Sequence, residues 1–413
     1  MKKPRILIII LFIFTNVLYA EEFDLNVYAS KFDSIPIGII DFSSTGTRLK
    51  KDQPHEIIAQ DLDFCGRFNV VTVSQYDSAV FADASAGIYV DGEYTVEGSE
   101  TVINCYLRDV ASQELIIGKK YKGEQNVVRA MMHRYCNELV EMLFGDRGIF
   151  ESKILYVKSS NGKRDIAIMD FDGYNHRQIT KNNVVNIFPA FVTKNSMIWT
   201  SYERGKPDLY IGSVADGSSK LFIYSKAVES SPAVSPVDGT VAYASSRNGN
   251  MDVYICNSDK TNVRQLTVHY GVDTSPAWSP NGYQIAFTSD RSGNPQIYVM
   301  DSDGANQHRV TFEHKYADSP SWSPKGDKIA YMAMGENGKF DIWTIAPDGT
   351  NPQKVTSISG HNEYPKWAPD GSLIAFVNAT GSYSDLYVVK ADGSRVRRVT
   401  KRGDVKMPDW SGF

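Results

Sequence analysis

Residues 275–287 read SPAWSPNGYQIAF, and close copies stand at residues 319–331 (SPSWSPKGDKIAY) and 364–376 (YPKWAPDGSLIAF). The proline of this unit recurs at intervals of 43 to 45 residues, as Pro189, Pro232, Pro276, Pro320, Pro365 and Pro408. An Asp-Gly pair keeps the same step from residues 172–173 to 392–393, with Asp259-Lys260 in one place. Repeats of about 40 to 45 residues that contain four short strands indicate a β-propeller.

One unit can be divided into its strands. Residues 275–278 form a first strand with proline near its start, where no ladder hydrogen bond is lost. Residues 279–282 (SPNG) fit a type I turn, because proline sets φ at the second position and glycine suits the fourth. Residues 284–288 and 296–300 are rich in β-branched and aromatic residues and predict the second and third strands. A fourth strand follows Asp303-Gly304 and ends near residues 310–311.

The two ends of the repeat region complete one another. The region begins with ILYV at residues 154–157, in the second-strand position, and ends with MPDW at 407–410, in the first-strand position. Together these fragments make one blade, which closes the ring and removes exposed sheet edges. We therefore expect an all-β six-bladed β-propeller over residues 151–413. Val234 replaces the aromatic of the unit, and Phe191 is followed by VTKN, so we expect those two blades to be less regular.

Residues 21–150 lack the repeat and predict a small α/β domain. Strands are expected at residues 35–42, 68–73, 94–97, 102–110 and 115–121, and a helix is expected at 55–64. Apolar residues with helical spacing predict a second helix over residues 126–143, which ends at Gly145.

The first twenty residues have the pattern of a secretory signal peptide: a basic start, the apolar run ILIIILFIF and a cleavage point after Ala20. The alternative is an uncleaved membrane anchor, but this run is short for a bilayer span of about 20 residues. Cleavage removes three basic residues and moves the formal net charge from −4 to −7. The predicted mature protein is exported, without stable membrane insertion, and its acidity argues against nucleic-acid binding.

Motifs for catalysis or for cofactor and metal binding are lacking. The sequence has neither GxSxG nor GxxxxGK[ST], and Ala59 stands where the zinc-protease motif after His55-Glu56 needs its second histidine. Cys65, Cys105, Cys136 and Cys256 form no CxxC pair, and export leaves both a disulfide and buried free thiols open. We expect no enzyme, no cofactor and no metal.

Two repeated features have a binding interpretation and a structural one. The aspartates of the Asp-Gly pairs could bind calcium, but Asp-Gly is also the usual composition of a tight turn. The repeated tryptophans could stack on sugars, but their fixed place in the unit favours packing between blades. The variable residues before each proline all lie at one end of the ring, where they predict either a partner-binding rim or a merely solvated face.

A signal peptide, a small α/β domain and six SPxWSPDG…IAF…DIYVMDxDG…RVT units, in that order, resemble the TolB family of the Gram-negative Tol–Pal system. The domain junction, Gly-x-x-Gly-x-Phe at residues 145–150, is similar to that of the family. The resemblance covers nearly the whole chain. It implies a monomeric periplasmic adaptor with no enzyme activity, which supports outer-membrane integrity and cell division.

The resemblance also implies partners and their sites. The mouth of the propeller is expected to bind the lipoprotein Pal, through the residues carried over by position: Glu229, Asp273, Thr274, Asp318, His361 and Glu363. The mature N-terminus is expected to bind TolA by adding a strand to a sheet edge, through Glu21, Glu22, Phe23, Asp24, Leu25, Asn26 and Val27. Other envelope lipoproteins are further candidate partners. The alternative function is an exported propeller-bearing peptidase or a glycan-binding protein.

Overall fold

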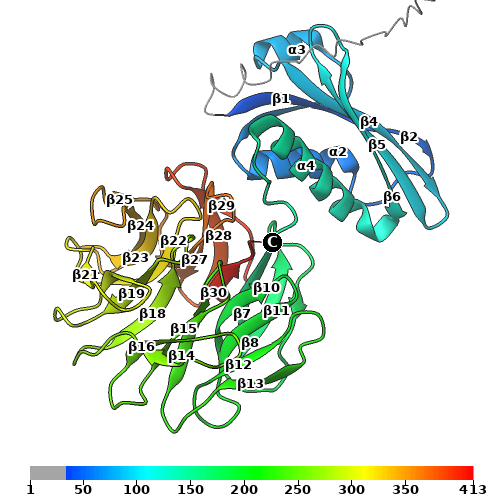
Figure 1. Cartoon of the computed structure of the whole chain (residues 1–413). Coiled ribbons are helices and arrows are strands. Elements are labelled where there is room, and N and C mark those ends of the chain that lie inside the picture. Colours follow the sequence, from blue (N-terminus) through cyan, green and yellow to red (C-terminus); the bar gives the residue numbers. More distant parts are fainter. Residues whose placement is uncertain (1–33, 161, 413) are drawn as a thin grey trace, which may run out of the picture.

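Six four-stranded antiparallel sheets stand around a common axis, and a separate α/β domain lies beside the ring (Figure 1). This computed structural model describes residues 34–160 and 162–412. The predicted fold class, an α/β N-terminal domain with an all-β six-bladed β-propeller, is confirmed. The predicted signal peptide, its cleavage after Ala20 and the segment from Glu21 to Val27 lie outside the described residues.

Each of the first five blades runs outward from the channel through four strands in chain order. With the innermost strand first, the first blade is β10 (Asn186–Thr193), β11 (Ser196–Ser201), β12 (Asp208–Ser213) and β13 (Ser219–Ile223), and the second is β14 (Glu229–Val234), β15 (Val241–Ser245), β16 (Asp252–Cys256) and β17 (Arg264–Gln265). The third blade is β18 (Asp273–Trp278), β19 (Gln284–Ser289), β20 (Gln296–Asp301) and β21 (His308–Arg309). The fourth is β22 (Ala317–Trp322), β23 (Ile329–Met334), β24 (Phe340–Ile345) and β25 (Gln353–Lys354). The fifth is β26 (His361–Trp367), β27 (Leu373–Thr380), β28 (Tyr383–Lys390) and β29 (Arg397–Arg398).

The sixth blade joins the two ends of the repeat region, as the sequence predicts. Its order is β30 (Val405–Trp410), β7 (Lys153–Ser160), β8 (Lys163–Asp170) and β9 (Arg177–Gln178). The last strand pairs antiparallel with the first, from Val405 opposite Lys158 to Trp410 opposite Ile154. The ring is therefore closed by backbone hydrogen bonds between segments some 250 residues apart in the sequence.

A buried polar latch is repeated in five of the six blades. In the fifth blade the Thr400 hydroxyl accepts from the Leu386 amide at 2.9 Å and donates to Asp385 Oδ1 at 3.0 Å. Equivalent contacts bind the fourth strand to the third at Thr180, Thr267, Thr311 and Thr356, with Gln296 Oε1 in place of the aspartate at Thr311. The blade that contains Phe191 lacks the latch among the described residues and has an extra register shift, so its predicted irregularity is confirmed. The blade with Val234 has the single shift of the others.

The N-terminal domain is one mixed sheet with helices on it. The sheet order is β3 (Phe68–Val73), β1 (Ile35–Ile40), β4 (Ile88–Glu97), β5 (Glu100–Asp109) and β6 (Leu115–Glu124), and β2 (Ser43–Gly46) pairs with β4. Helices α2 (Pro54–Phe64) and α4 (Val128–Phe144) pack together on it, and a 3-10 turn (Gln125–Val127) leads into α4. Gly145 ends α4 with φ of 77°, the left-handed cap that its place in the sequence predicts.

Two elements of this domain escaped prediction. Strand β2 has four small or polar residues and no apolar alternation, so nothing in its sequence marks a strand. Helix α3 (Ser78–Asp83) spans six residues and buries only Phe81, too little for a helical period to be visible. It is held by its cap, because the Asp77 carboxylate accepts from the amides of Ala79 and Val80.

The tryptophans and the cysteines are structural. Trp322, Trp367 and Trp410 are buried, and Trp278 is half-buried against a cluster that joins two neighbouring blades, which agrees with packing between blades. All four cysteines are buried and unpaired, and burial raises the pKa of Cys65 to about 12 and that of Cys256 to about 11. Of the two possibilities that the sequence leaves open, the structure has free thiols.

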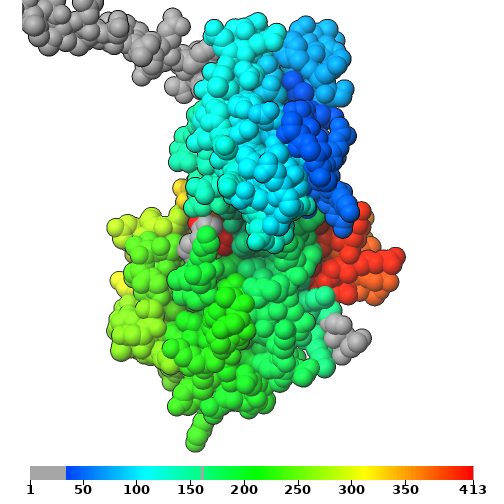
Figure 2. All heavy atoms as spheres, turned by 90° about the vertical axis from the view of Figure 1, so that its right-hand side faces the viewer, coloured from blue at the N-terminus to red at the C-terminus, as the bar shows by residue number. Residues whose placement is uncertain are grey.

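The N-terminal domain stands on the end of the ring that carries the turns after the first and third strands of each blade (Figure 2). Arg67 bonds Asp146 of the linker and Asp370 of a propeller turn, and Arg397 of the propeller bonds Asp63 of α2. Apolar residues of both domains also share one core cluster. No helix in the described ranges is both long and apolar enough to cross a membrane.

Candidate functional site

The six innermost strands share one distortion where they approach the channel. The residue before each proline has a positive φ, between 47° and 56°, at Phe188, Ser231, Ser275, Ser319, Tyr364 and Met407. The pairing register of each strand with its neighbour shifts at this same place. Residues other than glycine rarely adopt this conformation, and a bulge of this kind re-aims side chains. The repeated proline therefore marks a kink in the innermost strand of each blade.

These kinked residues and their prolines enclose the central channel. The cavity that they line has a volume of about 70 Å³. Three hydroxyls, from Ser231, Ser275 and Ser319, face it together with the larger side chains of Phe188, Tyr364 and Met407. None of its described lining residues is Asp, Glu, His or Cys. The space is far below the roughly 300 Å³ of an ordinary small-molecule pocket, so the channel suits water or the tip of one side chain.

One residue further back, a ring of half-buried side chains surrounds the mouth: Ser230, Thr274, Asp318, Glu363 and Lys406, with the buried Ile187 completing it. Three of the residues predicted for partner binding, Thr274, Asp318 and Glu363, belong to this ring. Asp318 is partly engaged, because Thr288 donates to its Oδ1 at 2.7 Å and the Tyr316 hydroxyl to its Oδ2 at 3.2 Å.

Glu363 is the carboxylate of this ring most available to a partner. It makes no hydrogen bond or ion pair within the described ranges. Burial raises its pKa, and electrostatic interactions with His361 and Lys406 oppose that rise. A cationic or amide group brought to the mouth would therefore find a desolvated carboxylate that lacks a strong partner.

Two of the predicted rim residues are misplaced, and the prediction is corrected here. Glu229 and Asp273 are fully buried, and they pair with Arg247 at 3.2 Å and with Arg291 at 2.7 Å. The reason is strand alternation: they stand three residues before the proline, inside the ladder, where the side chain faces the blade interior. His361 is half-buried and lies against the Phe340 ring, beside the mouth ring and not in it.

A collar of exposed aromatic residues surrounds the mouth, and the sequence analysis missed it. Its members lie in the loops that lead into the innermost strands or at the connections between second and third strands, where Tyr383 is the first residue of β28, and these segments meet at the same end of the ring. Tyr270 is 83% exposed and Phe312 68% exposed. We define the aromatic collar as Tyr202, Tyr224, Tyr270, Phe312 and Tyr383. The available signal was an aromatic residue in several of the otherwise variable loops before the repeated proline.

Arginines accompany this collar. Arg204, Arg309 and Arg402 lie over the rings of Tyr224, Phe312 and Tyr383, at 5.2, 4.8 and 5.2 Å. Exposed aromatic residues with arginines are enriched at protein interfaces, where they give large contact area at small entropic cost. The N-terminal domain stands on the opposite end of the ring (Figure 2), so its described residues leave the collar uncovered.

Comparisons with known proteins agree with this architecture. The family model of the TolB beta propeller domain matches residues 140–413, and that of the TolB amino-terminal domain matches residues 23–116. The chain belongs to the TolB family. The Tol-Pal system protein TolB of Desulfosudis oleivorans is 34% identical over 54% of this chain and 55% of its own length. The TolB homolog of Chlorobaculum tepidum is 36% identical over 45% and 44%. The chain thus matches about half the length of these relatives.

A solved TolB family structure shows the same fold. The crystal structure of TolB from Acinetobacter baumannii superposes with a TM-score of 0.78 and covers 91% of this chain and 96% of its own, at 22% identity. The likeness extends over both the N-terminal domain and the propeller. At this identity it establishes the arrangement of the chain and leaves the chemistry of the mouth to the residues themselves.

Proposed function

We propose that this TolB family chain is a periplasmic adaptor of the Tol–Pal system, which binds Pal at the propeller mouth and TolA through its mature N-terminus. One observation carries the first half: half-buried polar side chains ring a narrow channel, and a broad aromatic collar surrounds them. A surface of this form suits a folded protein partner that places a small polar or basic segment over the channel.

The chemistry of the mouth supports binding and not catalysis. The channel is too narrow for a substrate, and its serines have no His, Asp or Glu beside them among the described lining residues. A peptidase would need a base within hydrogen-bond reach of its nucleophile. A glycan-binding protein would use aromatic faces as well, so a protein partner is distinguished from a glycan by experiment.

Two tyrosines provide a matched test of the mouth. Tyr270 is 83% exposed in the collar, and Tyr283 is 73% exposed at the opposite end of the ring. Isothermal titration with soluble Pal should give tenfold or greater weakening for Tyr270→Ala, and a similar loss for Glu363→Gln. Tyr283→Ala should bind like wild type. If wild type fails to bind Pal, the adaptor function is wrong; if all three variants bind alike, only the placement at the mouth is wrong.

The N-terminal half of the proposal has a separate test. Deleting residues 21–27 should abolish binding to TolA and leave the affinity for Pal within twofold of wild type. Replacing the same seven residues by a Gly-Ser linker of equal length controls for chain length alone. Retained TolA binding in the deletion would remove this segment from the proposal.

A further inference from the structure

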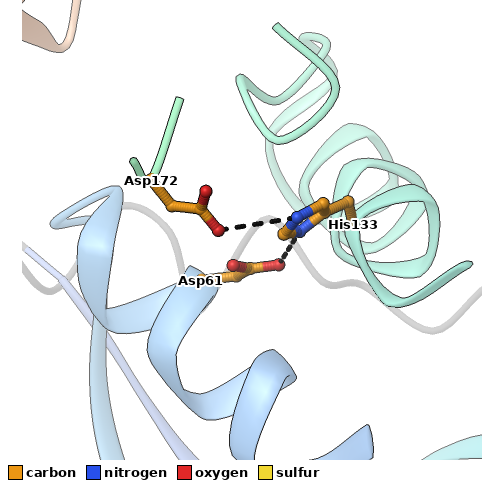
Figure 3. A group of neighbouring side chains, drawn as sticks. All are labelled: Asp61, His133 and Asp172. Atoms are coloured by element: carbon orange, nitrogen blue, oxygen red, sulfur yellow. Dashed lines mark hydrogen bonds and ion pairs between the residues drawn. The ribbon is translucent and has the colours of Figure 1, made fainter. Parts of the chain in front are cut away.

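A buried polar cluster joins the two domains on the side of the ring away from the mouth. Asp61 comes from α2, His133 from α4 and Asp172 from the propeller turn between β8 and β9 (Figure 3). Asp61 Oδ2 lies 2.6 Å from His133 Nδ1, and Asp172 Oδ2 lies 3.6 Å from His133 Nε2. Asp61 is 1% exposed and His133 is 4% exposed. The imidazole is therefore held between carboxylates of the two domains.

His133 Nε2 has no hydrogen-bond partner among the described residues, although it is buried. The short contact to Asp61 engages Nδ1, so Nε2, which faces Asp172, is the ring nitrogen left for a ligand. The separation of 3.6 Å is longer than an ordinary N–H···O bond. It does fit two ligands of one metal ion, because bonds of about 2.0 to 2.2 Å at tetrahedral or wider angles place the ligand atoms about 3.4 to 3.6 Å apart.

The charges around the cluster favour a cation. Arg129 donates two hydrogen bonds to Asp172 Oδ2, through Nε at 3.1 Å and through Nη2. Its guanidinium carbon lies 3.6 Å from the centre of the Tyr174 ring, and its Nη1 lies 3.7 Å from Asp52 Oδ1. The carboxylates of Asp52, Asp61 and Asp172 outnumber the single guanidinium of Arg129 around the cluster. Both hydrogen bonds from Arg129 go to Asp172 Oδ2 and use its two lone pairs, so an ion bound to this oxygen would replace one of them.

The site opens on a cavity that can supply further ligands. A pocket of about 410 Å³ at the domain junction is lined by Asp61, Arg129, Asp172 and Tyr174, together with Asp63 and Arg397. His133 is not among the lining residues, so the cavity reaches the cluster through Asp61 and Asp172, and its volume admits water molecules that would complete the coordination of an ion there. Burial raises the pKa of Asp61, and the hydrogen bond from His133 opposes this rise. A cation on Nε2 would strengthen that hydrogen bond.

We propose that His133 Nε2 and Asp172 bind a first-row divalent cation of the Zn²⁺ type at the domain junction, with Asp61 as the residue that orients the imidazole. Imidazole and carboxylate together are ligands that such ions accept. Because His133 belongs to the N-terminal domain and Asp172 to the propeller, the ion stabilises the docked arrangement of the two domains. The site is independent of the proposed partners at the mouth.

The test uses the mature protein after treatment with EDTA and dialysis. Titration with ZnCl₂ by calorimetry should show one site per chain, and Zn²⁺ should raise the melting temperature. His133→Asn and Asp172→Asn should lose this site and the thermal shift. Asp61→Asn should keep the stoichiometry but bind 10- to 100-fold more weakly, as expected when a residue that orients a ligand is lost.

Matched controls distinguish this site from casual surface binding. His308→Ala removes an exposed histidine, and Asp303→Asn changes the same turn position as Asp172 in another blade; both should bind Zn²⁺ like wild type. Circular dichroism confirms the fold of each variant, and Asp172→Asn, a turn substitution, serves where His133→Asn does not fold. Absence of binding in wild type, or binding unchanged in both Asp172→Asn and His133→Asn, would overturn the proposal.

Discussion

Asp273 and Thr274 are neighbours in the sequence but should respond to truncation in opposite ways. Asp273 faces the interior of its blade and pairs with Arg291, whereas Thr274 faces the channel mouth and its side chain makes no hydrogen bond within the described residues. Asp273→Ala is therefore expected to lower stability. Thr274→Ala is expected to leave stability unchanged and to weaken Pal binding.

The size of the stability loss can be worked from the contacts of Arg291. Removing one partner of a buried ion pair costs about 3 to 5 kcal/mol, mostly because the other charge is left unpaired. Here Arg291 retains two acceptors, Ser289 Oγ at 2.8 Å and Gln307 Oε1 at 2.7 Å, and lies 5.0 Å from the centre of the Tyr298 ring. We therefore expect about 3 kcal/mol for Asp273→Ala, the lower end of that range.

Urea denaturation followed by tryptophan fluorescence measures both variants against wild type. In a thermal melt of a structure of this size, a loss of about 3 kcal/mol in the free energy of unfolding corresponds to a fall in Tm of about 6 to 12 °C. Thr274→Ala, a substitution at a half-exposed site, should remain within about 0.5 kcal/mol. Asp273→Asn adds a third point, because its amide oxygen can still accept from Arg291, and it should lie between the two.

Two results of these stability measurements would contradict the prediction. If Asp273→Ala lost less than about 1 kcal/mol, the carboxylate could not be a buried partner of Arg291. If Thr274→Ala lost as much as Asp273→Ala, the two faces of β18 would not be divided as described. Either result would refute the correction that moves Asp273 from the rim to the blade interior.

Three further substitutions test other parts of the fold. Gly145→Ala places a side chain at φ of 77° with open space around it, so only the backbone cost of about 1 kcal/mol should appear in urea denaturation. Thr400→Val removes the latch to Asp385 and leaves an amide unsatisfied, and it should cost about 1 to 3 kcal/mol in the same assay. The hydrogen bond from Arg67 lowers the pKa of Asp146, so this pair stabilises above the ordinary carboxyl pKa of about 4, and the contribution is lost as pH falls through the lowered value. The fall in urea midpoint between pH 5 and pH 3 should therefore be smaller in Asp146→Asn than in wild type.

The propeller could be predicted because its marks are local. Proline at a strand start, glycine at a turn and a tryptophan two residues after the proline each follow from the conformation of a few neighbouring residues, as in Pro276, Trp278 and Gly282. Repetition then averages out individual exceptions. In the N-terminal domain each element occurs once, so a short helix held mainly by the Asp77 cap gave too little pattern to be seen.

The site was harder to predict, for two physical reasons. The sequence shows that Asp273 and Thr274 are adjacent, but the kink at Ser275 decides which of them faces the channel, and a change of one residue exchanges the faces. The cluster of Asp61, His133 and Asp172 depends on how the domains dock. No spacing in the sequence encodes that contact.

The three positions before each repeated proline therefore have separate tasks. The third position back is fully buried in every blade, as Asn186, Glu229, Asp273, Ala317, Asn362 and Val405, and substitutions there act on stability. The position next to the proline needs a positive φ and lines the channel. Only the middle position combines access to the mouth with an ordinary backbone, and its chemistry ranges from Ile187 through Asp318 to Lys406. Specificity for a partner can change there without disturbing the ring, so exchanges at the middle position should alter which protein binds while the Tm stays within about 2 °C of wild type.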